Sequence, residues 1–219
     1  MAIHAVLFDL DGTLADTAPD LIAALHRLCA EEGRPAPAYE TLRPQVSKGS
    51  RGLIEVGFGL RPGDPGFEAV TQRFLVHYAA AICVDTVLFD GMAELLASLE
   101  ESGIAWGIVT NKPHRFTLPV MAGLGLAQRA ACLVSGDTCA HPKPHPAPVL
   151  HACALAGVAP DEALYVGDDL RDIQAGQAAG LRSIAAAYGY LGDNLPITDW
   201  QADHIIERPL DLLHLLNSH

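Results

Sequence analysis

Hydrophobic positions along the chain follow two alternating patterns. Short apolar runs, each suited to one buried strand, occur at Ala5–Phe8, 104–109, 131–134, 163–166 and 181–185. Between these runs, apolar residues recur at the spacing of one helix face in 91–101, 149–156 and 173–179. Strands that alternate with helices favour a parallel sheet covered on both faces. The pattern therefore predicts an α/β fold with a Rossmann-like, three-layer core.

The stretch 17–83 interrupts this alternation. It contains no convincing strand, and its apolar spacing predicts helices over 20–31, 39–46, 52–58 and 67–82, with a Pro- and Gly-rich loop at 61–66. We therefore predict an all-helical insert over 17–83, carried by a core domain made of 1–16 and 84–219. The insert leaves and rejoins the core near Asp16–Thr17 and Val84–Asp85, where we expect a hinge.

Composition and charge exclude several classes of protein. Half of the residues are hydrophobic, and 14 basic residues stand against 26 acidic ones, a net charge of −12. A nucleic-acid binder usually shows a basic face, and this chain has none. Five cysteines without C-x-x-C spacing argue against a disulfide framework or a zinc site. Against this negative charge, an anionic substrate would need a metal ion or well-placed lysines.

The sequence also gives no sign of a membrane or secreted protein. No apolar run reaches the roughly 18 to 20 residues of a membrane span. The first nine residues hold no basic stretch and no cleavage pattern. We expect a cytoplasmic protein, a monomer or weak homodimer, with a small molecule rather than nucleic acid or membrane as its partner.

The first apolar run ends in two carboxylates, in the motif Asp9-Leu10-Asp11-Gly12-Thr13. Carboxylates this close repel each other unless a cation or a proton lies between them. Mg²⁺, a hard ion that prefers oxygen ligands, would suit the pair. An aspartate can also act as a nucleophile and form an aspartyl-phosphate, while the second serves as general acid and base. Backbone N–H groups at Gly12 could bind phosphate oxygens.

Three further motifs follow later strands. Thr110 and Asn111 follow the run 104–109, and Lys143 lies between two prolines as a positive charge fixed against an anion. The segment 167–172, Gly-Asp-Asp-Leu-Arg-Asp, adds carboxylates that could complete a metal site. Each motif alone suits an ordinary turn or helix cap. Together, at the carboxyl ends of parallel strands, they indicate one site. Lys112 and Arg115 are interpreted as parts of a helix start.

In this order, the motifs resemble those of the haloacid dehalogenase superfamily over the whole chain. The helical insert resembles the small cap domain of that superfamily. The resemblance implies that Asp9 is the nucleophile and Asp11 the acid and base. It also implies that Thr110, Asn111 and Lys143 bind the phosphoryl group that is transferred.

The resemblance also implies a Mg²⁺ site. The ion would be held by the Asp9 side chain, the Asp11 backbone carbonyl and Asp168. Asp172 would orient a water on the metal or the Lys143 amine. Asp169 stands where the family often has serine or threonine.

The presence of Asp11 favours phosphomonoester hydrolysis, because superfamily members that need not protonate an alcohol commonly lack this residue. Within the superfamily, the chain resembles phosphoglycolate phosphatases and, more closely, N-acetylmuramic acid 6-phosphate phosphatases. The segments that carry this likeness are 89–96, 106–113, 166–173 and 188–190. Both substrates have a carboxylate beside the phosphate. Lys48 or Arg51, at the start of a predicted helix, could bind that carboxylate, or both could be solvated surface residues.

Two other functions stay open at this point. A phosphosugar mutase would use the same Asp9 but return the phosphoryl group to the sugar. A non-catalytic binding protein would keep the fold and lose the chemistry, although the complete set of motifs argues against it.

Overall fold

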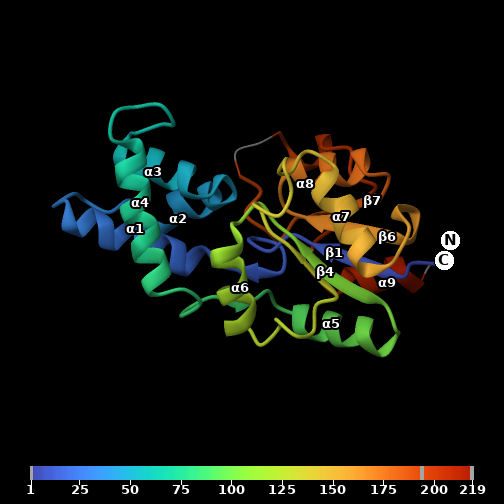
Figure 1. The fold of residues 1–219 in the computed structure, drawn as a ribbon. Helices are drawn as coiled ribbons and strands as arrows, with labels where there is room; N and C mark the ends of the chain where they lie inside the picture. The colour runs from blue at the N-terminus through green and yellow to red at the C-terminus, as the bar shows by residue number, and fades with distance from the viewer. Residues whose placement is uncertain (1, 193–194, 218–219) are drawn as a thin grey trace.

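The computed structural model describes residues 2–192 and 195–217, and a six-stranded sheet forms its centre (Figure 1). The strand order is β5-β4-β1-β6-β7-β8, and all neighbours run parallel. The strands are β1 (Ala5–Phe8), β4 (Ala105–Val109), β5 (Cys132–Val134), β6 (Ala163–Gly167), β7 (Arg182–Ala186) and β8 (His204–Ile206). The α/β prediction is confirmed. β8 was not predicted, because its first two residues are exposed and it has no apolar run of its own.

The two faces of the sheet bury alternate residues of each strand, as the period of a strand requires. Val6 and Phe8 pack with α5 (Met92–Glu101), α6 (His114–Gly123) and α9 (Asp211–Asn217). Ala5 and Leu7 pack on the other side with α7 (Ala147–Ala156) and α8 (Leu170–Ala178). Figure 1 shows these two layers above and below the strands. The result is the predicted three-layer core.

The residues between β2 and β3 form a group of helices beside the sheet, at the left of Figure 1. They are α1 (Ala18–Glu31), α2 (Tyr39–Leu42), a 3-10 helix (Arg43–Lys48), α3 (Ser50–Phe58) and α4 (Phe67–Ala80). Their apolar faces bury one another in a cluster of their own, which Phe116 and Tyr190 join from the core side. No strand occurs between Thr17 and Cys83 in this described stretch. The division into two domains at these positions remains a prediction.

One predicted helix of this group, 39–46, is wrong in its second half. The α-helix ends at Leu42, and the chain continues as a 3-10 helix from Arg43. Pro44 accounts for the change, because proline has no N–H to donate to the carbonyl one α-helical turn earlier.

The two connections between this helical group and the sheet lie side by side. β2 (Ala15–Asp16) pairs antiparallel with β3 (Val87–Leu88). The buried Asp20 carboxylate of α1 then accepts hydrogen bonds from the backbone N–H groups of Val84, Asp85 and Thr86, at 3.0, 3.0 and 2.9 Å. These bonds tie α1 to the second connection.

Two short 3-10 helices, Pro160–Glu162 and Ile197–Asp199, complete the secondary structure of the described residues. Within the same residues, no helix has the length and apolar character needed to cross a membrane.

Candidate active site

The site lies at the carboxyl edge of the sheet, where three neighbouring strands end. Asp9 follows β1, Thr110 follows β4 and Asp168 lies one residue beyond β6. β1 lies inside the sheet, with β4 and β5 on one side of it and β6, β7 and β8 on the other. Parallel sheets of this type open a crevice at the carboxyl ends of the strands where the strand order changes direction. A cavity of about 590 Å³ occupies the place, between the sheet edge and the helical group. Every residue that the sequence predicted for the site lines this cavity.

Lys143 is the positive centre of the buried part. Its ammonium lies 2.9 Å from Asp9 Oδ1 and 2.6 Å from Asp172 Oδ1, and it donates to the Val109 carbonyl and the Tyr165 hydroxyl at 2.8 Å each. Burial alone would lower the pKa of Lys143, but the carboxylates of Asp172 and Asp9 outweigh it and raise that pKa. Lys143 is therefore a fixed cation, as the sequence predicted.

Three buried carboxylates gather around this lysine. Asp9, Asp168 and Asp172 each offer one oxygen within 4.8 Å of the others. Burial raises the pKa of Asp172 to about 7, although Lys143 opposes the shift. Burial, with the charges of Asp9 and Asp172, also raises the pKa of Asp168 well above its ordinary range. More negative charge is buried here than one ammonium neutralises.

Asp168 is held in place from two sides. The Thr13 hydroxyl donates to its Oδ1 at 2.9 Å, and the Tyr190 N–H donates to its Oδ2 at 2.8 Å. Gly12 makes the close approach of the first motif possible, with a positive φ of 88°. A Cβ at Gly12 would stand only 2.2 Å from Asp168 Oδ2. The glycine of the first motif therefore leaves room for the carboxylate of the fourth.

Asp9 is less completely satisfied. Its Oδ1 is buried and has no hydrogen-bond partner, since the nearby Lys143 ammonium contacts it as an ion pair without hydrogen-bond geometry. This oxygen is therefore poised to interact with a ligand or cation in the cavity.

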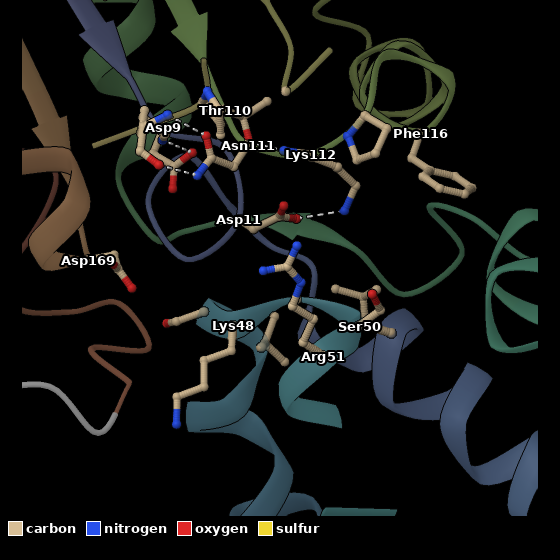
Figure 2. A pocket seen from close by; sticks show the side chains of 18 of the residues that line it. Asp9, Asp11, Lys48, Ser50, Arg51, Thr110, Asn111, Lys112, Phe116 and Asp169 are labelled. Atoms are coloured by element: carbon tan, nitrogen blue, oxygen red, sulfur yellow. Dashed lines mark hydrogen bonds and ion pairs between the residues drawn. The ribbon is translucent and has the colours of Figure 1, made fainter. Parts of the chain in front are cut away.

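Asp11 points into the cavity and is held by two donors. The Thr17 hydroxyl lies 2.5 Å and the Lys112 ammonium 2.8 Å from its Oδ1. Figure 2 shows the Asp11–Lys112 pair across the upper part of the cavity. Asp11 is more exposed than Asp9, with 19% of its side chain accessible against 13%.

Sequence reasoning missed Lys112, which it assigned to a helix start. The side chain is only 6% exposed, and its ammonium lies 4.8 Å from the centroid of the Tyr78 ring as well as beside Asp11. Burial alone would lower the pKa of Lys112, but Asp11 and Tyr78 raise it, so that it stays charged. Its position directly after Thr110 and Asn111 was the available signal. Arg115, in contrast, is exposed, as that interpretation requires.

Thr110 and Asn111 hold different positions. The Thr110 hydroxyl accepts a bond from the Lys112 N–H at 3.1 Å, which leaves its own proton for a ligand. The Asn111 amide instead makes two bonds with the backbone of Lys143, at 3.0 and 2.9 Å. Asn111 therefore fixes the Lys143 loop, and its contact with phosphate stays a prediction.

Asp169 joins the core to the helical group. It caps α8, and its carboxylate accepts two bonds from the Arg171 guanidinium, at 2.8 and 2.9 Å. Arg171 reaches on to the Ser47 carbonyl at 2.6 Å. Although burial opposes it, this arginine lowers the pKa of Asp169. The residue that departs from the family pattern thus helps to anchor Ser47, which precedes Lys48 at the end of the 3-10 helix.

Those two cations point in different directions. Figure 2 shows the Arg51 guanidinium directed toward Asp11, whereas the Lys48 amine points away from the catalytic aspartates. Both side chains are exposed and both belong to residues that line the cavity. Of the two cations that the sequence could not separate, Arg51 is the one directed at the site.

Comparison with known proteins identifies the family of this chain. Residues 6–186 match the model of the haloacid dehalogenase-like hydrolases. The chain belongs to this family. The resemblance that the motifs indicated is therefore confirmed, and the protein is an enzyme of a hydrolase family.

Individual relatives cover nearly the whole chain. The N-acetylmuramic acid 6-phosphate phosphatase of Pseudomonas putida is 44% identical over 218 residues, covering 100% of this chain and 98% of its own. The phosphoglycolate phosphatase of Xanthomonas campestris is 47% identical over 210 residues, covering 95% and 94%. A crystal structure of a predicted phosphoglycolate phosphatase from Haemophilus somnus superposes with a TM-score of 0.85, at 26% identity and 97% coverage of both chains.

Proposed function

We propose that this protein is a Mg²⁺-dependent phosphatase that hydrolyses a small carboxylated phosphomonoester through an aspartyl-phosphate on Asp9. The observation that carries the proposal is the Asp9 carboxylate, buried at the end of the central strand beside Lys143, with one oxygen that lacks a donor. The two relatives named above, both phosphatases, support the same reaction.

The residues present suit a magnesium ion. Asp9, Asp168 and Asp172 concentrate negative charge that Lys143 alone does not balance, and carboxylate oxygens are the ligands that Mg²⁺ prefers. Asp9 and Asp168 would hold the ion, with the Asp11 backbone carbonyl. Asp172 would keep Lys143 in place. When bound, the ion would neutralise charge on the phosphoryl oxygens and on the carboxylates.

In the first half of the reaction, Asp9 acts on the phosphoryl group. A carboxylate oxygen of Asp9 bonds to phosphorus while the bond from phosphorus to the leaving oxygen breaks. Lys143 and the Thr110 hydroxyl stabilise the charge spread over the phosphoryl oxygens. Asp11 gives its proton to the leaving oxygen, which departs as an alcohol.

In the second half, water completes the hydrolysis. Asp11, now a carboxylate, takes a proton from a water molecule that attacks the phosphorus of the aspartyl-phosphate. The bond between phosphorus and Asp9 breaks, and inorganic phosphate leaves. Lys112 and Thr17 both donate to Oδ1 of Asp11 and hold the side chain in place, so that Oδ2 is available for both proton transfers.

Arg51 is the residue that would read the carboxylate of the substrate. Its guanidinium points toward Asp11, where the leaving group departs (Figure 2). A guanidinium presents paired donors that match a carboxylate. The negative net charge of the chain, −12, would also repel a small anion of this kind less than a polyanion.

Phosphate release tests the proposal. Wild-type protein is assayed with phosphoglycolate, N-acetylmuramic acid 6-phosphate and hexose phosphates, with Mg²⁺ and after EDTA, and Asp9→Asn serves as the blank. We expect release from at least one carboxylated ester that is lost in EDTA and in the variant. Release of an isomerised phosphosugar instead of inorganic phosphate would favour the mutase. Cytoplasmic localisation and a monomeric or weakly dimeric state remain predictions.

A further inference from the structure

Tyr165 is a buried residue without a role in the steps above, and its hydroxyl lies beside the Lys143 ammonium. The residue belongs to β6, where it pairs with Leu7 of β1, and it is 1% exposed. Its ring packs in the apolar layer between the sheet and the helices α7 and α8. A Cβ at Gly176 of α8 would lie only 3.3 Å from this ring. The strand and this close packing therefore fix the place of the hydroxyl.

The Lys143 ammonium has more partners than protons. Among the described residues, four oxygens lie within 2.9 Å of it: Asp9 Oδ1, Val109 O, Tyr165 OH and Asp172 Oδ1. An ammonium carries three N–H donors. One of the four oxygens is therefore without a full hydrogen bond from Lys143 at any moment.

The Tyr165 hydroxyl supplies a fourth proton to this group. It lies 2.8 Å from the Val109 carbonyl and 3.2 Å from Asp172 Oδ1, and it can donate to either oxygen. Burial, with the charges of Asp172 and Asp9, raises the pKa of Tyr165 well above its ordinary range, so the hydroxyl keeps its proton. Four protons thus serve the four oxygens.

The four oxygens differ in how much they need a donor. The two carboxylates carry charge and the Val109 carbonyl is a buried acceptor, so each is destabilised when it has no donor. The Tyr165 oxygen is neutral and is itself a donor, so it loses least when Lys143 turns away. It is therefore the partner that Lys143 can leave when a phosphoryl oxygen enters the site, while the hydroxyl proton stays with Val109 or Asp172.

From this arrangement we propose that Tyr165 is a positioning residue, which holds one N–H of Lys143 in the free enzyme and leaves it for the phosphoryl group. The proton stays on Lys143 throughout, and only its hydrogen-bond acceptor changes. Without the hydroxyl, three N–H groups would face three oxygens that each need a donor. The ammonium could then turn to a phosphoryl oxygen only by leaving one of them unpaired. This inference rests on the proposed phosphatase function, in which Lys143 stabilises the charge of the phosphoryl group.

Binding of orthovanadate tests the inference without turnover, because vanadium takes five ligands, as phosphorus does when Asp9 attacks it. Calorimetry measures the Kd of vanadate, in the presence of Mg²⁺, for wild-type protein and for Tyr165→Phe. We expect the variant to bind vanadate about tenfold more weakly, since one buried hydrogen bond is lost when the ligand binds. The Kd of Mg²⁺ should not change, because the carboxylates that would hold the ion are intact.

Phosphate release gives a second readout. In Tyr165→Phe, kcat should also fall by about tenfold, whereas KM should change by less than about twofold. The reason for this split is that the bond from Lys143 strengthens as charge spreads over the phosphoryl oxygens in the transition state.

Ser183→Ala is the matched control. Ser183 pairs with Tyr165 in the register of β7, is buried, and donates its hydroxyl proton to Asp203 at 3.1 Å. We expect this variant to change neither the Kd of vanadate nor kcat. The free energy of unfolding should fall by a similar amount in both variants, because the oxygens that the Tyr165 hydroxyl contacts keep Lys143 as a partner.

A double variant shows through which group Tyr165 acts. Lys143→Met removes the ammonium, so adding Tyr165→Phe to it should weaken neither vanadate binding nor kcat any further. If the two residues acted independently, the double variant would lose a further factor of about ten.

The outcomes separate this inference from the proposed function. Equal vanadate binding in wild type and Tyr165→Phe, a further loss in the double variant, or a joint loss of Mg²⁺ and vanadate binding would overturn the role of Tyr165. Failure of the wild-type protein to bind vanadate would overturn it as well. Absence of phosphate release by the wild-type protein, with the expected vanadate pattern intact, would instead contradict the phosphatase and leave the role of Tyr165 toward Lys143 standing.

Discussion

The backbone N–H of Tyr190 donates a hydrogen bond of 2.8 Å to Oδ2 of Asp168. The side chain of the same tyrosine reaches the first connection to the helical group. Its hydroxyl accepts bonds from the N–H groups of Thr17 and Ala18, at 2.8 and 2.9 Å, and donates to Asp16 Oδ1 at 2.8 Å. One residue therefore joins a carboxylate of the proposed metal site to the point where the chain enters α1.

Tyr190→Phe tests the structural importance of this junction. The ring and the backbone bond to Asp168 remain, but the buried N–H of Thr17 loses its acceptor and that of Ala18 keeps only a 3.3 Å bond to Asp16 Oδ1. We expect the free energy of unfolding, measured by urea denaturation, to fall by about 2–4 kcal/mol. Tyr188→Phe is the control, since its hydroxyl makes one bond, to the Thr13 carbonyl at 3.1 Å, and should cost about 1 kcal/mol. Equal losses in the two variants would contradict this account of Tyr190.

Lys112→Met should impair catalysis more than folding. The variant leaves Asp11 without the ammonium that positions it, so we expect kcat to fall by roughly thirtyfold, equivalent to about 2 kcal/mol, with a smaller change in KM. Lys112→Arg should restore part of kcat, because it restores the charge. Arg115→Met, an exposed cation at the start of the same helix, should leave kcat unchanged. A normal kcat in Lys112→Met would show that Asp11 needs no such support.

Gly12→Ala should disrupt the carboxylate cluster. The new Cβ would lie 2.2 Å from Asp168 Oδ2, at a positive φ, so Asp168 must move. We expect Mg²⁺ affinity, measured by calorimetry, and phosphate release to fall together. Gly33→Ala has a similar positive φ but meets no atom within 4 Å, and it should lose only about 1 kcal/mol of stability. Intact Mg²⁺ affinity in Gly12→Ala would be inconsistent with the assigned site.

The carboxylate cluster also predicts how stability depends on pH without metal. Burial raises the pKa of Asp172 from 3.8 to about 7, so the folded state holds this proton more tightly than the unfolded chain. Stabilisation from this group is complete below pH 3.8 and is lost as the pH rises toward about 7. Chemical denaturation of EDTA-treated protein should show the free energy of unfolding fall as the pH rises across this window. Added Mg²⁺ should make this fall smaller. A slope that is unchanged in Asp172→Asn would assign the effect to another group.

The parts of the site that the sequence could predict are those fixed by strand ends. Asp9, Thr110 and Asp168 follow apolar runs, and parallel strands bring the ends of such runs to one edge of the sheet. The local hydrophobic pattern was therefore enough to predict that these residues lie close together.

The parts that sequence reasoning missed depend on packing between distant segments. Lys112 lies against the Tyr78 ring of α4, a contact between segments far apart in the sequence. Tyr190 reaches Thr17 across 173 positions of chain, and no periodicity records that contact. The distinction between Lys48 and Arg51 also required the direction of each side chain, which the sequence does not give where a 3-10 helix ends and α3 begins.

The most direct test of the account is to find the phosphoryl group on Asp9. Wild-type protein is mixed, in the presence of Mg²⁺, with a phosphomonoester that it hydrolyses. The reaction is quenched in acid within one turnover, and the protein is digested and analysed by mass spectrometry. The account predicts a phosphoryl adduct on the peptide that contains Asp9, absent in Asp9→Asn and present in Asp90→Asn, an exposed carboxylate outside the cavity. Phosphate release by wild-type protein with no adduct, or undiminished release by Asp9→Asn, would contradict it.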